Sequence, residues 1–178
     1  MRTVKIICFF FAILWIPANS YARANYYLEA DPIAFLLQGY SLHGGIEYSM
    51  FRLQLGVFAA KLPADLRDNK HFTVEQNGLG LKYDYFGNEP TGGFLGLEYG
   101  YTKLTYKHSA SGDKERRQAN LAGIRVGYKY IIKQQFYVTP WLAIKRNISG
   151  ARTVKLSGDE YHESEWILFP TIHVGVQF

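Results

Sequence analysis

The sequence predicts an all-β protein, an eight-stranded antiparallel up-and-down transmembrane β-barrel. From residue 40 onwards the chain repeatedly alternates between apolar and mixed residues, and a period of two is typical of a β-strand. The apolar face of these segments is aliphatic in the middle and tyrosine-rich at the ends, whereas the other face is rich in glycine and charge. An aliphatic band between aromatic girdles indicates strands that face lipid rather than a soluble core.

The first element is a predicted signal peptide, residues 1–22. A basic start precedes the apolar run IICFFFAILWI, and Ser20 and Ala22 occupy the small-residue positions of a cleavage site. The run has eleven residues, whereas a membrane-spanning helix needs roughly 20. We therefore expect export with cleavage after Ala22, with Ala24 as the alternative position.

The second element is the barrel itself, residues 23–178. Loss of the signal peptide leaves 18 basic and 15 acidic residues, a net charge of +3, and removes the single cysteine, Cys8. The mature chain then has no disulfide, no cysteine nucleophile and no thiolate metal ligand. Because the chain is exported and only modestly basic, no nucleic-acid partner is expected.

Seven strands follow directly from the alternation. The clearest pair is YSLHGGIEYSMFRLQLGVF, in which a tight turn at Ser49 and Met50 separates two alternating segments. A closed barrel of this type has an even number of strands, so the stretch 25–37 is the candidate for the eighth, although Pro32 interrupts it. In chain order the predicted strands are 25–37, 40–48, 51–59, 78–85, 95–102, 121–130, 137–145 and 166–178.

The connections alternate in length, and this orients the barrel. The short connections are 49–50, 86–92 and 132–135, and the long polar ones are 61–71, 107–117 and 147–165. Bacterial barrels have short periplasmic turns and long extracellular loops. The last strand is therefore expected to run towards the periplasm.

These features resemble the small outer-membrane β-barrel superfamily of Gram-negative bacteria, of the OmpA, OmpX and opacity-protein type. The likeness rests on the signal peptide, the paired strands of YSLHGGIEYSMFRLQLGVF and the ending TIHVGVQF. It implies a place in the cell outer membrane, among its lipid and lipopolysaccharide, after insertion by the barrel-assembly machinery. It also implies that this machinery recognises a C-terminal phenylalanine and the apolar residues alternating before it, here Ile172, Val174, Val176 and Phe178.

The inward face carries charges that must be paired in a narrow lumen. The predicted lumen charge network consists of Glu47, Arg52, Lys82, Asp84, Glu98, Arg125, Lys129 and Lys145. Within it we expect mutual ion pairs among Glu47, Glu98, Arg52 and Arg125. A narrow channel for small solutes is the alternative, and the width of an eight-stranded barrel argues against it.

Two serine–histidine arrangements raise the alternative of a lipid-modifying hydrolase, of the lipid A deacylase or phospholipase type. Ser41, His43 and Glu47 share one face of a strand, as a Ser-His-Glu relay requires, but a packed lumen excludes an acyl substrate. His162 and Ser164 have the His-x-Ser order of such enzymes without a recognisable remote partner. We expect no catalytic residue, no cofactor and no metal site.

The loop KHSASGDKERR is basic. Its residues Lys107, Lys114, Arg116 and Arg117 are the candidate contacts to the phosphates of lipopolysaccharide or to a host or surface ligand. Solvated loop charge without a ligand is the alternative. The function predicted from the sequence is a structural or surface-interaction role in the outer membrane.

Overall fold

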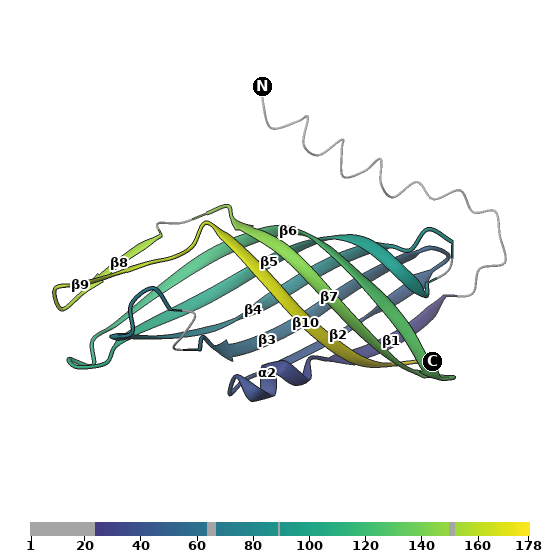
Figure 1. Ribbon diagram of the computed structural model, residues 1–178, viewed down its shortest axis with the longest axis horizontal. Coiled ribbons are helices and arrows are strands. Elements are labelled where there is room, and N and C mark those ends of the chain that lie inside the picture. Colours follow the sequence, from purple (N-terminus) through teal and green to yellow (C-terminus); the bar gives the residue numbers. More distant parts are fainter. Residues whose placement is uncertain (1–23, 64–66, 89, 150–151) are drawn as a thin grey trace, which may run out of the picture.

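Eight strands close into one antiparallel barrel in the computed structural model, which describes residues 24–63, 67–88, 90–149 and 152–178 (Figure 1). Consecutive strands pair along the chain from β1 to β7, and β10 lies between β7 and β1 to complete the circle. This confirms the predicted fold class. The predicted signal peptide, 1–22, lies outside the described residues. Among those residues, no helix is long and apolar enough to cross a membrane.

The barrel strands differ in length, and the middle ones are the longest. Their bounds are β1 Asn25–Ala30, β2 Tyr40–Tyr48, β3 Phe51–Lys61, β4 Phe72–Tyr85, β5 Gly92–His108, β6 Lys114–Lys133, β7 Phe136–Asn147 and β10 Trp166–Gln177. β5 and β6 have 17 and 20 residues, although about 9–11 suffice to span a membrane. These strands therefore project beyond one end of the barrel.

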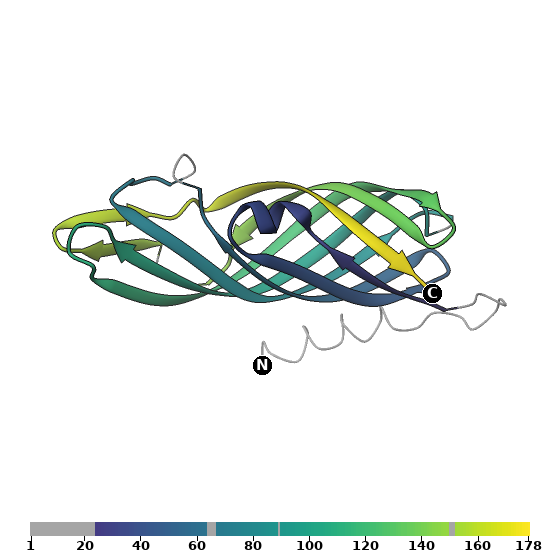
Figure 2. The ribbon, with the colours of Figure 1, turned by 90° about the horizontal axis from the view of Figure 1, so that it is seen from below.

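The predicted first strand, 25–37, is wrong in its second half. β1 ends at Ala30, and the helix α2, Pro32–Leu36, follows. Asp31 accepts a hydrogen bond from the Ile33 N–H at 2.8 Å and so caps the helix, while Pro32 fits the first helical position because it lacks an N–H. α2 contacts β2, β3 and β10 and lies along the side of the barrel (Figure 2).

The two ends of the barrel differ. At the turn end, close to the C-terminus, short connections join β2 to β3, β4 to β5 and β6 to β7 as predicted, and Ser49 and Gln134 adopt positive φ there. At the opposite loop end, two predicted loops are wrong. The predicted loop 107–117 is mostly strand, with only residues 109–113 between β5 and β6.

The second wrong loop is 147–165, which contains a β-hairpin. β8, Thr153–Leu156, and β9, Asp159–His162, form their own two-stranded sheet at the loop end. Sequence alternation could not reveal it because each strand has only four residues.

Burial is inverted relative to a soluble protein. Arg52 and Glu47 on the inner face are 0% and 1% exposed, whereas Leu55 and Leu168 on the outer face are 62% and 64% exposed. Exposed tyrosines flank the exposed aliphatic residues, among them Tyr40, Tyr85, Tyr99, Tyr128 and Tyr130. An apolar outer band with aromatic edges is the surface of a transmembrane barrel.

Candidate functional site

The structure places all eight residues of the predicted charge network on the inner face. Arg52 lies at its centre, where Nε donates to Asp84 Oδ2 at 2.8 Å and Nη1 donates to Glu29 Oε1 at 3.1 Å. Arg125 shares Asp84, with Nε 3.4 Å from Oδ1. Glu29 also accepts from the Gln54 amide at 2.5 Å and lies 2.7 Å from His173 Nδ1.

The remaining acids pair with lysines. Lys129 Nζ donates to both carboxylate oxygens of Glu47, at 2.6 and 2.8 Å, and Lys145 Nζ lies 2.8 Å from Glu98 Oε1. The expected mutual pairing of Glu47, Glu98, Arg52 and Arg125 is therefore wrong, because each pairs with a residue outside that set. The alternation identifies the inward residues but not which neighbours meet across the lumen.

Sequence reasoning missed Glu29, which is 3% exposed. Its segment showed broken alternation because β1 has only six residues before α2 begins. Glu29 supplies the fourth acid for the five inward bases of the predicted network. The signal that could have placed it inside is the short alternation in which Tyr27 and Glu29 oppose the exposed Tyr26 and Leu28.

Aromatic faces hold the inward cations as well. Arg125 lies 4.1 Å from the ring centroid of Trp141, and Lys145 lies 4.0 Å from that of Phe169. The Arg52 guanidinium lies 5.1 and 5.0 Å from the rings of Phe86 and Phe94. Such cation–π contacts stabilise buried cations, and they explain how the lumen accommodates more bases than the predicted acids could pair.

Large side chains occupy the space above the inward glycines. A Cβ on Gly56 would lie 1.8 Å from His43 Nδ1, and one on Gly175 would lie 2.4 Å from the Tyr137 ring. Glycine at these positions therefore admits an inward ring from a neighbouring strand. The filled lumen disfavours the small-solute channel.

The proposed Ser41, His43 and Glu47 relay is not assembled. Ser41 Oγ lies 2.8 Å from His43 Nε2, but His43 Nδ1 has no hydrogen-bond partner among the described residues, and Glu47 binds Lys129. His43 instead stacks on His173 with ring centroids 4.9 Å apart. A relay requires the acid to orient the second ring nitrogen, so this pair lacks its third member.

The second serine–histidine pair, His162 and Ser164, forms its hydrogen bonds with two different residues. His162 Nδ1 lies 3.2 Å from Thr153 Oγ1, whereas the Ser164 hydroxyl donates to the Trp166 carbonyl at 2.6 Å. This pair therefore lacks the nucleophile–base hydrogen bond of a hydrolase.

The predicted basic contacts lie on strands rather than in a loop. Lys107 on β5 faces Lys114 on β6 in the strand register, and both are exposed, as is Arg116. Arg117 alternates to the other face and forms an ion pair with Glu115 at 2.5 Å. Lys103, which sequence reasoning did not select, joins the exposed side. We call Lys103, Lys107, Lys114 and Arg116 the outer basic face.

The predicted assembly-signal residues Ile172, Val174, Val176 and Phe178 lie along the outer side of the last strand. Val174 and Phe178 are 42% and 64% exposed. Phe178 exchanges two backbone hydrogen bonds with Tyr26, at 3.1 and 2.9 Å, and so extends the contact between β10 and β1. The structure thereby defines where these side chains lie. Their recognition by the barrel-assembly machinery stays a prediction.

A second small core orders the loop end. Phe72, Val74 and Tyr106 from β4 and β5 pack with Val154 and Tyr161 from the β8–β9 hairpin, and all five are buried. We call this cluster the loop-end core. Polar contacts reinforce it, since the Asn69 amide donates to the Glu160 carbonyl and the Ser157 hydroxyl donates to Asp113. The hairpin is therefore packed against the extended strands.

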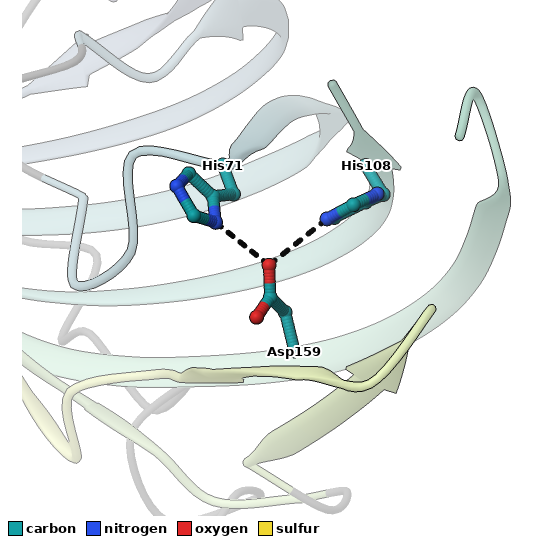
Figure 3. Close-up of side chains that lie close together, drawn as sticks. All are labelled: His71, His108 and Asp159. Carbon is teal, nitrogen blue, oxygen red and sulfur yellow. Dashed lines mark hydrogen bonds and ion pairs between the residues drawn. The ribbon is translucent and has the colours of Figure 1, made fainter. Parts of the chain in front are cut away.

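Beside the loop-end core, two imidazoles converge on one carboxylate oxygen. His71 Nδ1 and His108 Nε2 lie 2.7 and 3.0 Å from Asp159 Oδ2 (Figure 3). These hydrogen bonds, that from His71 first, hold the pKa of Asp159 below its usual value. Sequence reasoning missed the three residues because they come from three separate segments of the chain.

Comparisons with known proteins concern the fold. No family profile matches the chain, and no curated protein sequence matches it. The chain is similar to the N-terminal β-barrel domain of Pseudomonas aeruginosa OprF, with 18% identity and a TM-score of 0.49 over 88% of this chain and 99% of that one. It is also similar to Neisserial surface protein A, with 11% identity and a TM-score of 0.47 over 88% of this chain and 94% of that one. A third similar structure is a major outer membrane protein from Thermus thermophilus, with 12% identity and a TM-score of 0.45 over 89% of this chain and 100% of that one.

Proposed function

We propose that the protein is an integral outer-membrane barrel with a structural and surface-interaction role, exported by a cleaved signal peptide. In this proposal the turn end faces the periplasm and the loop end faces the outside, where the outer basic face binds the phosphates of lipopolysaccharide. The ordered loop-end core then presents a rigid surface to further partners. Since the lumen is filled and neither serine–histidine pair forms a relay, the role resides on the outer surfaces.

One observation carries this proposal, the order of outward side chains along β5. Leu95 and Leu97 are followed by Tyr99 and Tyr101, and then by Lys103. At about 3.4 Å per residue, Lys103 lies roughly 14 Å beyond Tyr99 along the strand. That order matches hydrocarbon, interface and phosphate layers.

Three of the four residues of the outer basic face come close together across β5 and β6. Lys107 and Lys114 are register partners, and Arg116 lies opposite Thr105, between Lys103 and Lys107. A groove of about 430 Å³ lies between Lys103 and Arg116. Arginine and lysine at this spacing suit phosphate oxygens, since each contact is a charge-assisted hydrogen bond.

Two experiments test the proposal. Cell fractionation should recover the protein with the outer membrane, in a form that migrates faster before boiling; recovery as a soluble periplasmic protein would exclude the barrel in lipid. The purified barrel should then retain phosphorylated lipid A better than dephosphorylated lipid A. We expect Lys103→Glu with Arg116→Glu to abolish that difference and Lys133→Glu, an exposed lysine at the turn end, to preserve it. An unchanged preference in the double variant would refute the phosphate site.

A further inference from the structure

The strongest unassigned feature outside the lumen is the His71, His108 and Asp159 trio. The three donor atoms come from the segment before β4, the end of β5 and the start of β9, and all lie within 4.8 Å of one another (Figure 3). Both ring nitrogens approach the same oxygen, Asp159 Oδ2, rather than one oxygen each. The three donors thus surround one small volume.

Their spacing is close to that of a metal site. With zinc–ligand bonds near 2.0–2.1 Å in a tetrahedron, neighbouring donors lie roughly 3.3–3.5 Å apart. The two nitrogen–oxygen separations, 2.7 and 3.0 Å, must widen by about 0.3–0.8 Å to reach that range, and the two nitrogens, which lie within 4.8 Å of each other, must reach it as well. Rotation of the exposed His71 ring supplies most of this movement, since its side chain is 70% exposed.

His108 is positioned as a ligand by its surroundings. Its Nδ1 lies 3.0 Å from Ser111 Oγ and accepts a hydrogen bond from the Ser111 backbone N–H at 3.3 Å, so Nε2 carries the ring proton and donates it to Asp159. The ring packs edge-on against Phe72 of the loop-end core at 5.5 Å, and the His108 side chain is only 7% exposed. A metal-binding histidine usually donates the proton of its second ring nitrogen; metal binding at Nε2 would therefore move the ring proton to Nδ1, where Ser111 Oγ at 3.0 Å can accept it.

We propose that His71, His108 and Asp159 form a binding site for a divalent transition-metal ion, Zn²⁺ first, at the loop end. Two imidazole nitrogens and one carboxylate oxygen are a donor set for zinc, with a fourth position left to water or to a group of a bound partner. A metal there would fasten the segment before β4 and the β5 end to the β8–β9 hairpin. The proposal is independent of lipopolysaccharide binding.

The test uses the folded full-length barrel in detergent micelles after treatment with a chelator. Calorimetric titration with ZnCl₂ should show one ion per chain, and an excess of Mg²⁺ should not compete. His71→Ala and Asp159→Asn should each weaken Zn²⁺ binding by more than 100-fold, and Ser111→Ala by about 10-fold through the orientation of His108. His162→Ala, a histidine on β9 outside the trio, is the matched control and should bind as the unaltered chain does.

A second readout separates metal binding from folding. His71 is exposed, so His71→Ala should keep the fast gel mobility of the unheated barrel. Zn²⁺ should slow trypsin cleavage of the segment before β4 in the unaltered chain and in His162→Ala, but not in His71→Ala. Absence of Zn²⁺ binding by the unaltered chain, or binding by His71→Ala and Asp159→Asn equal to that of the unaltered chain, would overturn the proposal.

Discussion

Replacing Lys129 by methionine should destabilise the folded barrel by about 3–5 kcal/mol. The ammonium donates to Glu47 Oε1 at 2.6 Å, to Glu47 Oε2 at 2.8 Å and to Gln177 Oε1 at 2.9 Å. It also lies 4.2 Å from the Tyr137 ring. Methionine keeps the apolar stem, so the chief loss is the partner of Glu47, whose carboxylate stays buried without another ion pair among the described residues.

A double-mutant cycle isolates that effect. Lys129→Met combined with Glu47→Met removes both charges, and replacing a buried ion pair by apolar residues is often nearly neutral. We therefore expect the double variant to recover most of the lost free energy of unfolding, with a coupling energy of at least about 2 kcal/mol. Lys133→Met, on the exposed turn end of the same strand, should change the free energy of unfolding by less than about 0.5 kcal/mol.

Urea unfolding of the barrel in lipid vesicles, followed by tryptophan fluorescence, measures these differences. The slope of free energy against urea should stay constant across the four variants, so that the midpoint reports stability. A cost below about 1 kcal/mol for Lys129→Met would refute the reasoning, because breaking a buried pair costs more. A double variant that loses as much free energy of unfolding as the two single variants together would also refute it.

Three further outcomes are expected. Gly175→Ala should cost about 1–3 kcal/mol by overpacking, because its Cβ would meet the Tyr137 ring, whereas Gly80→Ala has no atom within 4 Å and should be tolerated; equal urea midpoints would contradict this. Leu55→Arg on the lipid face should cost about 2–4 kcal/mol, and an unchanged midpoint would remove Leu55 from the bilayer. Burial raises the pKa of Glu163 to about 7, so the folded hairpin holds this proton more tightly and its stability falls as pH rises from about 4.5 to 7. Protease protection of the β8–β9 hairpin should therefore decline over that range, and Glu163→Gln should remove the decline.

The two faces of the barrel could be predicted because strand alternation is a local property. Arg52 and Leu55 were assigned to opposite faces from their positions in one segment, and their exposed fractions of 0% and 62% agree with that assignment. Pairing partners depend on strand tilt and register around the whole barrel. Lys129 meets Glu47 across 82 residues of sequence, and no local pattern encodes that contact.

The loop end could not be predicted for a related reason. Val154 and Tyr161 stand in short polar stretches, and they become buried only because Phe72 and Tyr106 lie on strands that continue past the barrel. Charged sequences such as GDKERR resemble loops by composition, yet the register pairs Lys107 with Lys114 within a continuous hairpin. The charged composition correctly predicts that these side chains are exposed. It does not predict a strand, because the backbone hydrogen bonds of the extended β5 and β6 determine the conformation there.

The projecting half of the β5–β6 hairpin contributes residues to both proposed binding sites, on opposite faces. Lys103 and Lys107 point outward from β5, whereas His108 points inward towards Asp159, because successive side chains of a strand alternate. The two sites should therefore fail independently. Lys103→Glu with Arg116→Glu should leave Zn²⁺ affinity within about twofold, since both side chains lie on the outer face and salt screens exposed charges over a Debye length of roughly 8–10 Å. His71→Ala should likewise leave the preference for phosphorylated lipid A unchanged. Loss of both activities in either variant would show that the hairpin had rearranged as a unit, and hence that neither substitution reports on a separate site.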